Sequence, residues 1–152
     1  MDSNWPRWIW ASTTKYFQIS INTNIPIYIE GDDRNTNELA DYCEFRMDGP
    51  IIIETTKGFF DLNLHINILI NSLRDEKDTH KIHKAVGLVA SKFTTWIDIF
   101  KYGDNPQVDD GSLLGCMLLQ GEIDIEHFGQ IEVAVRAMQA TVSGAYKIQL
   151  TG

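Results

Sequence analysis

The stretch Phe59 to Asn71, FFDLNLHINILIN, decides the fold that this sequence predicts. Apolar and polar residues alternate along it, and a period of two is typical of a β-strand with one dry and one wet face. The dry face would consist of Phe60, Leu62, Leu64, Ile66, Ile68 and Ile70, and the wet face of Asp61, Asn63, His65, Asn67 and Asn71. We therefore expect a long strand with the core on one side and solvent on the other.

A helix is predicted directly after this strand. The charged segment Leu73 to Asp78 forms a turn, and beyond it apolar residues recur at helical spacing, at Ile82, Val86, Val89 and Phe93. Lysines and a serine occupy the positions off this stripe. The pattern predicts an amphipathic helix from Thr79 to Thr94 that lies on the dry face of the strand.

The N-terminal segment predicts another helix, which ends near Ile21. Asn4 is suited to cap it, and Pro6 at the start lacks only an N–H that would have no helical partner there. Neighbouring helix positions differ in direction by about 100 degrees, so three tryptophans within six residues do not easily all face inward. At least one is expected to contact a partner or another subunit, among Trp5, Trp8 and Trp10.

The remaining strands are predicted from shorter alternations. Ile25 to Glu30 is a short strand, which Pro26 confines to a sheet edge or a strand start. Turns are expected at Asp48-Gly49-Pro50 and Thr56-Lys57-Gly58, because glycine permits positive φ and proline fixes its own φ. These turns would divide Tyr42 to Asn71 into an antiparallel meander.

The C-terminal half predicts a strand at Trp96 to Tyr102, a mobile loop at Asp104 to Ser112, and closing strands that run to Leu150. The apolar positions change from odd to even numbers near Ala137, which indicates a bulge or turn there. The predicted fold class is α+β. A mostly antiparallel sheet, a meander plus closing strands, is covered by the N-terminal and the central amphipathic helix in a single domain over residues 1–152.

The composition excludes several classes of protein. No apolar run approaches the roughly 20 residues needed to cross a bilayer, and Met1 to Ile21 lacks the features of a secretory signal, so no membrane partner is expected. The net charge of −8, with 13 scattered Lys and Arg, argues against a stable grip on nucleic acid, which needs a basic face. Cys43 and Cys116 have no metal-site spacing and are expected to be buried thiols.

Candidate metal ligands are few. His80 and His83 lie one helical turn apart, and His65 or His127 would have to supply a third ligand, so solvated histidines are the favoured interpretation. Asp104, Asp109 and Asp110 share a loop but lack the alternating oxygens and the closing glutamate of a calcium loop, and turn formation explains them equally well. We expect no metal site.

No catalytic or cofactor motif is present in the sequence. The acids around Glu30 to Asp33, together with Glu44 and Asp48, occupy loop and turn positions where carboxylates are solvated. Gly129 and Gly144 stand alone, so there is no phosphate-binding loop or dinucleotide fingerprint. These observations favour a protein that is not an enzyme and has no cofactor. Conspicuous aromatic residues favour assembly as the mode of action.

The order of these elements resembles that of the tail-terminator proteins of long-tailed bacteriophages and, more distantly, of the tail-tube proteins. The resemblance covers nearly the whole chain, from the helix with Trp5 to Phe17 to the closing strands that end at Leu150. It implies a structural virion protein, assembled in the host cytoplasm, that forms a homo-hexameric ring on the tail tube. It also implies contacts with the tail-tube protein and the head-tail connector protein, with DNA only passing through the lumen.

Candidate contact regions follow from exposure and mobility: the loops Gly31 to Ala40 and Gly103 to Ser112, and the hairpin Thr55 to Gly58. The interface candidates are Trp5, Trp8, Trp10, Asp32, Arg34, Lys57, Asp104, Asp109 and Asp110. Three alternatives stay open: a tail-tube or other neck subunit, a small metal-dependent hydrolase that uses His80 and His83, and a monomeric binding module.

Overall fold

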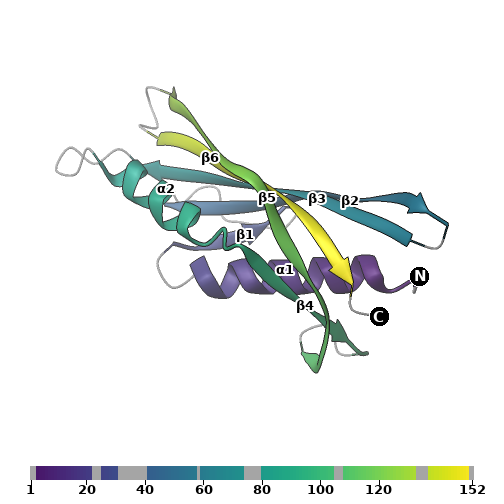
Figure 1. Cartoon of the computed structure of the whole chain (residues 1–152). Helices are drawn as coiled ribbons and strands as arrows, with labels where there is room; N and C mark the ends of the chain where they lie inside the picture. Colours follow the sequence, from purple (N-terminus) through teal and green to yellow (C-terminus); the bar gives the residue numbers. More distant parts are fainter. Residues whose placement is uncertain are drawn as a thin grey trace.

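Two helices and six strands form an α+β fold with one mixed, strongly twisted sheet (Figure 1). The structure is a computed structural model, and it describes residues 3–21, 25–30, 41–57, 59–73, 80–104, 108–132 and 137–150. The elements are α1 (Trp5–Ile21), β1 (Ile27–Ile29), β2 (Tyr42–Thr56), β3 (Phe59–Leu73), α2 (Lys81–Ser91), β4 (Trp96–Tyr102), β5 (Asp109–Glu132) and β6 (Ala137–Leu150).

The strand order in the sheet is β1-β2-β3-β6-β5-β4. β1 runs parallel to β2, and the other neighbouring strands pair antiparallel. The predicted α+β class is confirmed, whereas the antiparallel meander is confirmed only in part. The exception to antiparallel pairing is β1, which lies on the outer side of β2 and runs in the same direction as β2.

The alternation in β3 gives the sheet its two faces. Leu62, Leu64, Ile66, Ile68 and Ile70 are all at most 3% exposed, as the dry face requires. The polar residues between them lie on the opposite face and are half-buried from Asp61 to Asn67. β3 is flanked by β2 and β6, so its dry face becomes the floor of the core.

Both helices cover the dry face, as expected. α1 buries an apolar stripe that includes Ile9, Phe17 and Ile21, and the Phe17 ring lies 5.6 Å from that of Phe45 and 5.2 Å from that of Phe93. α2 packs against β3 and β6 and buries Ile82, Ala85, Val86 and Val89. The core is therefore a layer of helices on a sheet whose other face is polar.

The predicted turn at Asp48-Gly49-Pro50 is wrong, because β2 continues through it as one strand of 15 residues. The pairing with β3 shifts register between Asp48 and Ile51, so the glycine and proline form an irregularity within the strand. Gly49 has a φ of +104°, and a Cβ there would lie 3.0 Å from the carbonyl oxygen of Asn63. The long hairpin β2–β3 therefore replaces the first part of the predicted meander.

The predicted loop from Asp104 to Ser112 is shorter than expected. Asp109 already belongs to β5, where it pairs with Tyr102, so the last four loop residues are part of the strand. β5 is a single strand of 24 residues, with register shifts that include one between Gln120 and Asp124. At the far end of β5, Glu132 pairs with Ala137 at the start of β6. The chain therefore reverses direction between these two residues, close to the turn or bulge predicted near Ala137.

Some predictions fall outside the described residues. These are the loop 31–40, with Asp32 and Arg34, most of the charged turn after Leu73, and Gly58 of the predicted hairpin.

Among the described helices, none has the length and apolarity that crossing a membrane requires.

Candidate functional site

The three N-terminal tryptophans differ in their surroundings. Trp5 and Trp8 are buried in the core with their rings edge-on at 5.6 Å, so they are removed from the set of surface candidates. Trp10 is 37% exposed and rests edge-on against Phe45 at 5.9 Å. Trp10 is therefore the tryptophan that does not face fully inward, as expected for at least one of the three.

Side chains of α1 bind the outer edge of the second half of β4. Trp8 Nε1 and Arg7 Nη2 each donate to the carbonyl oxygen of Tyr102 at 2.8 Å. The Ser12 hydroxyl accepts from the backbone N–H of Phe100 at 2.9 Å and donates to the carbonyl oxygen of Phe100 at 3.3 Å. At this end of β4 the helix supplies hydrogen bonds that a neighbouring strand would otherwise make.

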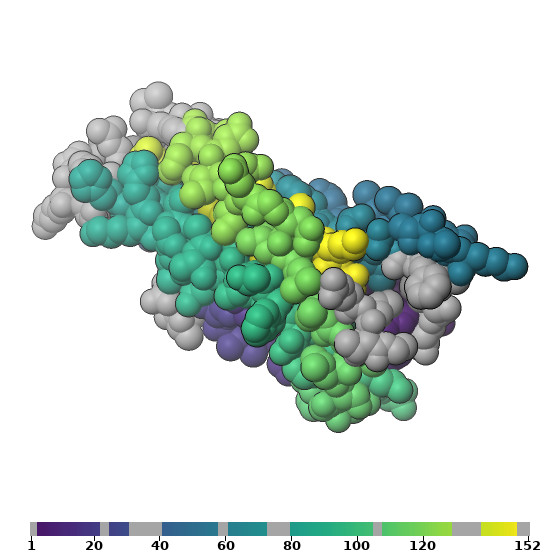
Figure 2. Space-filling view, viewed as in Figure 1, coloured from purple at the N-terminus to yellow at the C-terminus, as the bar shows by residue number. Residues whose placement is uncertain are grey.

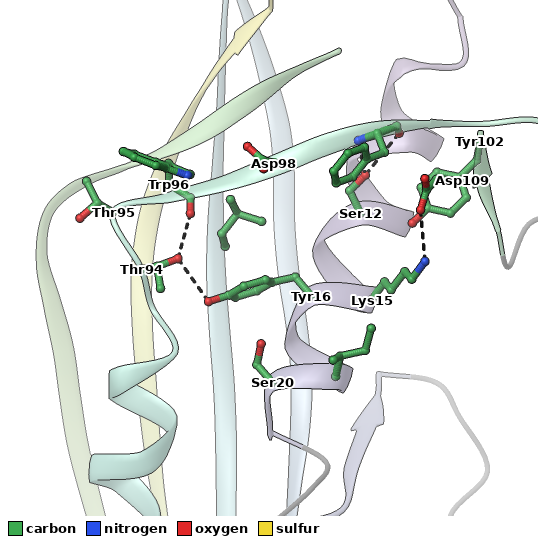
Figure 3. Close-up of a pocket in the computed structure, with 13 residues that line it drawn as sticks. Ser12, Lys15, Tyr16, Ser20, Thr94, Thr95, Trp96, Asp98, Tyr102 and Asp109 are labelled. Atoms are coloured by element: carbon green, nitrogen blue, oxygen red, sulfur yellow. Dashed lines mark hydrogen bonds and ion pairs between the residues drawn. The ribbon is translucent and has the colours of Figure 1, made fainter. Parts of the chain in front are cut away.

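The first half of β4 borders a groove of about 690 Å³ between α1 and β4 (Figure 3). Two apolar residues at its margins are open to solvent: Ile19 of α1 is 64% exposed, and Trp96 is 63% exposed with its side chain on the sheet face opposite the helices, through its pairing with Leu118 and of Leu118 with Lys147. Tyr16 of α1 also lines the groove and donates from its hydroxyl to the carbonyl oxygen of Lys92 at 2.8 Å. An exposed tryptophan is typical of a protein contact site.

Backbone groups of β4 also point into this groove. Leu119 N donates to the carbonyl oxygen of Thr95 at 2.8 Å, and antiparallel pairing alternates between residues that bond to the neighbour and residues that do not. The N–H and C=O groups of Trp96 and Asp98 therefore point away from β5, toward α1. The Trp96 carbonyl oxygen accepts a hydrogen bond from the Thr94 hydroxyl at 2.9 Å. α1 lies along this part of the sheet edge, because Ser12 bonds to Phe100 at one end of it and Tyr16 bonds to Lys92 at the other.

Three aspartates predicted as contact residues lie where β4 turns into β5. Asp109 forms an ion pair with Lys15 at 3.2 Å, and this contact, followed by the Gly111 backbone N–H, lowers the pKa of the Asp109 carboxyl from 3.8. Asp110 accepts from the backbone N–H of Ser112 at 2.8 Å, which is a local turn contact. Asp104 is exposed. Asp109 and Asp110 are therefore engaged in the turn, and Asp109 also in the α1 contact.

A second apolar surface lies on the distal half of the β2–β3 hairpin, which we name the arm and define as residues 50–57 and 59–63. Ile51, Ile52 and Ile53 are 62%, 42% and 50% exposed, and the arm projects at one end of the molecule (Figures 1 and 2). Lys57 is exposed at its end. Within the described residues β1 pairs with β2 from Cys43 to Phe45, so the outer edge of β2 in the arm is not covered by β1.

Two of the four histidines meet between α2 and β5. The His83 and His127 rings are 4.9 Å apart, and the His80 ring lies 6.4 Å from His83. His127 pairs with Ala140, which pairs with Ile70, so it lies on the helix-covered face of the sheet, whereas His65 lies on the other. The described residues hold no group of three or more His, Cys, Asp or Glu side chains arranged for a metal ion.

The remaining candidate groups are buried or paired on the sheet. Burial, with the charge of Asp41 adding to it, raises the pKa of the Cys43 thiol to about 12, and Cys116 is half-buried. Glu44 forms an ion pair with Arg46 at 2.8 Å. Such groups are poorly suited to nucleophilic or acid-base chemistry at neutral pH.

The sheet face opposite the helices is polar along β3 and β6, and it also carries the exposed side chains of Ile51, Ile53 and Trp96. Cross-strand partners point to the same side, so the wet face of β3 continues into β6 through the pairs Asn67 with Ser143 and Asn63 with Lys147. Lys147 forms an ion pair with Asp61 of β3 at 3.2 Å. On this face the cations Lys147 and Arg46 each form an ion pair with a nearby carboxylate, Asp61 and Glu44.

Comparison with known proteins shows the fold and no family. No protein-family model matches the chain, and no curated protein does. Twelve chains among the solved structures match it. One of them has a TM-score of 0.65 at 9% sequence identity, over 95% of this chain and 96% of its own, and its name states no function. At this identity the likeness concerns the fold alone.

Proposed function

We propose that this protein is a ring-forming structural subunit of a bacteriophage tail, a tail terminator that caps the tail tube. One observation carries the proposal: large apolar side chains lie exposed at two separate places on the molecule. These are Ile51 to Ile53 in the arm, and Trp96 of β4 with Ile19 of α1 at the margins of the groove. Exposed apolar side chains on sheet edges promote association, so a protein that keeps them is suited to assembly.

Two different surfaces favour a ring over a simple dimer. When a patch on one copy binds a different patch on the next copy, the contact is heterologous, and its repetition yields a closed ring or an open filament. The resemblance in element order supplies the expected form, a ring of six copies in the virion. In that ring one rim contacts the tail-tube protein and the other contacts the head-tail connector protein.

The polar sheet face suits the lining of a channel through which DNA passes. The chain has a net charge of −8, and on this face the cations Arg46 and Lys147 are paired with Glu44 and Asp61. DNA binding draws most of its affinity from cations that neutralise phosphates. A lumen lined by this face would therefore let DNA move without holding it.

Solution mass and electron microscopy test the proposal. We expect purified protein, over a concentration series, to reach one discrete oligomer that appears as rings with a central hole. Open-ended tubes would contradict the terminator and support a tail-tube subunit instead. A strictly monomeric mass at the highest concentration would contradict both and favour a monomeric binding module.

A small metal-dependent hydrolase is the second candidate, and the contact between His83 and His127 favours it. Imidazole rings at this distance are close enough to share a transition metal ion. Elemental analysis of the purified protein tests the idea directly. Bound zinc together with an esterase or phosphatase turnover that is lost in His83→Ala and His127→Ala would support the hydrolase, and absence of both would exclude it.

A further inference from the structure

We propose that the second half of β5 binds an extended peptide segment of another protein, which adds to the sheet as a further strand. The segment would alternate basic and apolar residues. The inference goes beyond the proposed function and does not depend on it, because the partner is a peptide segment and not a second copy in a ring.

The outer side of β5 is covered along only its first half. β5 has 24 residues, whereas β4, its outer neighbour, has 7. Pairing with β4 runs from Asp109 to Leu118, and just beyond it Leu119 N donates to the carbonyl oxygen of Thr95. No described strand pairs with this side of residues 121–128, which we name the β5 edge. The β5 edge lies beside α2 on the face that Figure 2 shows.

The direction of the backbone groups follows from the pairing of β6. Bonding to the two neighbours alternates along an antiparallel strand, so Leu119 faces β4 and Gln120 faces β6, where it pairs with Ala145. β6 keeps an unbroken register with β3, so its alternation is regular. Ser143 and Thr141 therefore also direct their backbone groups toward β5.

Backbone hydrogen-bonding groups in the β5 edge point outward. The partners of the two β6 residues are Asp124 and Glu126, so both of these bond to β6. Ile125 and His127 alternate with them, so their N–H and C=O groups point away from β6. No hydrogen bond from a described residue reaches these outward groups. A strand edge of this kind is a template for an added strand.

The two faces of the β5 edge differ in chemistry. Asp124 and Glu126 lie on the sheet face opposite the helices, are exposed, and form no ion pair with a described residue. Ile125 is 47% exposed and lies on the helix-covered face, through its pair with the buried Val142. An added strand would therefore meet carboxylates on one face and an isoleucine on the other.

Room for the apolar side chains of the added strand lies beside α2. The His83 ring is 4.9 Å from that of His127, so this side of α2 borders the β5 edge. Gly87, one turn after His83, is exposed, and a Cβ there would have no contact within 4 Å beyond the helix itself. The missing side chain leaves space for a residue that packs against Ile125.

Charge argues against the same edge of a second copy as the added strand. In an antiparallel pair of two such edges centred on Ile125, Asp124 of one copy would lie opposite Glu126 of the other. Like charges directly opposite each other destabilise a strand pair, whereas lysine or arginine at these positions would stabilise it. The alternation of acid and isoleucine therefore favours a segment that alternates basic and apolar residues.

A synthetic peptide of about eight residues, in which lysine and valine alternate, tests the proposal. The matched control groups the same lysines and valines in two blocks, because a net charge of −8 attracts any cationic peptide. We expect the alternating peptide to bind at least about tenfold more tightly than the grouped one, measured by isothermal titration at physiological salt. Equal affinities would overturn the proposal.

Hydrogen exchange followed by NMR locates the bound peptide. The amides of Ile125 and His127 should exchange rapidly in the free protein and become protected when the alternating peptide binds. The amides of Asp124 and Glu126 bond to β6 and should be protected in both states. Binding without new protection at Ile125 and His127 would overturn strand addition at this edge.

Methylation of the peptide nitrogens tests the main-chain hydrogen bonds without any change in the protein. β4 runs antiparallel to β5 along the same outer side, and we expect the peptide to do the same. Opposite residues that bond then share a face, so the valines beside Ile125 donate to β5 and the lysine N–H groups point to solvent. Methylated valines should abolish binding, and methylated lysines should preserve it. Loss with both peptides, or with neither, would contradict the pairing.

Two protein variants separate the backbone from the charge. Ile125→Pro removes an N–H that points outward, which an edge strand tolerates, and should abolish binding. Glu126→Gln removes one carboxylate and should weaken binding about threefold. Asp48→Asn, at an exposed position of β2, is the matched control and should bind normally. Circular dichroism verifies that each variant is folded, and a folded Ile125→Pro that binds normally would overturn the proposal.

The outcomes distinguish this site from the proposed function. Rings of the unchanged protein that do not bind the alternating peptide would overturn strand addition and leave the tail-terminator proposal standing. A monomeric protein that binds the peptide at the β5 edge would do the reverse. If Ile125→Pro breaks up the rings and the peptide does not bind, the β5 edge belongs to a contact between copies, and the peptide proposal is wrong.

Discussion

The two halves of β2 contain similar residues in opposite surroundings. In the first half Cys43 and Phe45 are fully buried beneath α1, and Phe45 packs on Phe17 and Trp10. In the second half Ile52, on the same face of the sheet through its pairing with Leu62, is 42% exposed, whereas Ile51 and Ile53 are exposed on the opposite face through their pairs with Asn63 and Asp61. Both halves pair with β3 through the same hairpin, so hydrogen bonding along the strand does not cause the difference. What differs is whether a helix covers the strand.

The comparison separates stability from assembly. Apolar residues in the covered half contribute to folding of a single copy, since they leave water when the chain folds. Apolar residues in the arm leave water only if a second molecule covers them. Apolar residues therefore stabilise the folded chain in one half of the strand and favour association in the other half. Substitutions in the covered half should change the free energy of unfolding, and substitutions in the arm should change self-association.

The largest expected effect is on the covered half. Phe17→Ala removes a fully buried ring that packs between Phe45 and Phe93, so it should lower the free energy of unfolding by about 3–5 kcal/mol. Ile52→Ala in the arm should lower it by less than about 1 kcal/mol, because the side chain is already exposed. Urea unfolding of dilute protein measures both. Equal losses would show that the arm belongs to the folded core of a single copy.

Thiol reactivity gives the next effect. The pKa of Cys43 is raised to about 12 from 9.0, so its thiolate fraction at neutral pH is lower by about a thousandfold, and the thiol is also buried. Cys43 should therefore resist alkylation while the protein is folded, whereas a cysteine in place of Ile53 should react at once. Mass spectrometry after timed iodoacetamide treatment follows both.

The control for thiol reactivity is the native Cys116, which is half-buried and should react at an intermediate rate. Protection of Ile53→Cys in concentrated protein, and its release on dilution, would place the arm in the contact between copies. Rapid alkylation of Cys43 in folded protein would contradict the division of β2 into a covered and an uncovered half.

Sequence reasoning locates the covered half, and in the uncovered half it names only the hairpin Thr55 to Gly58 as a contact region and not the exposed isoleucines before it. The alternation of β3 and the helical spacing of Ile82, Val86 and Val89 identified the core face, because burial on one side leaves a period in the sequence. Ile51 to Ile53 lack such a period and were assigned to an ordinary strand. Nothing local distinguishes an apolar strand under a helix from one under a second copy.

The groove was missed for a related reason. Trp96 begins a correctly predicted strand, but only the strand order shows that this strand is the last of the sheet and borders a groove against α1. Of the three tryptophans named from the sequence, Trp5 and Trp8 are buried and Trp10 is 37% exposed. A contact between distant segments depends on strand order, and periodicity within a segment carries no information about strand order.

A smaller effect concerns the end of β4 that α1 already covers. Trp8→Phe keeps an aromatic ring in the core and removes the N–H that donates to the carbonyl oxygen of Tyr102. Arg7 still donates to that oxygen, so the expected loss in unfolding free energy is about 1 kcal/mol, measured in urea. Trp10→Phe, at an exposed position, is the control and should change little. Equal losses would mean that the Trp8 hydrogen bond contributes nothing to covering this edge.

The smallest effect is the pH dependence of the same covered end. The Lys15 ammonium and the Gly111 N–H lower the pKa of the Asp109 carboxyl below its unfolded value of 3.8. A lowered folded pKa stabilises the protein above the unfolded pKa, and the contribution is lost as pH falls below 3.8 through the folded pKa. Asp109→Asn should therefore lower the melting temperature slightly at pH 6 and reduce its fall below pH 4, whereas Asp110→Asn should keep the normal acid dependence. This ion pair joins α1 to the start of β5. An acid dependence that is the same in Asp109→Asn as in the unchanged protein would contradict the contribution of the ion pair.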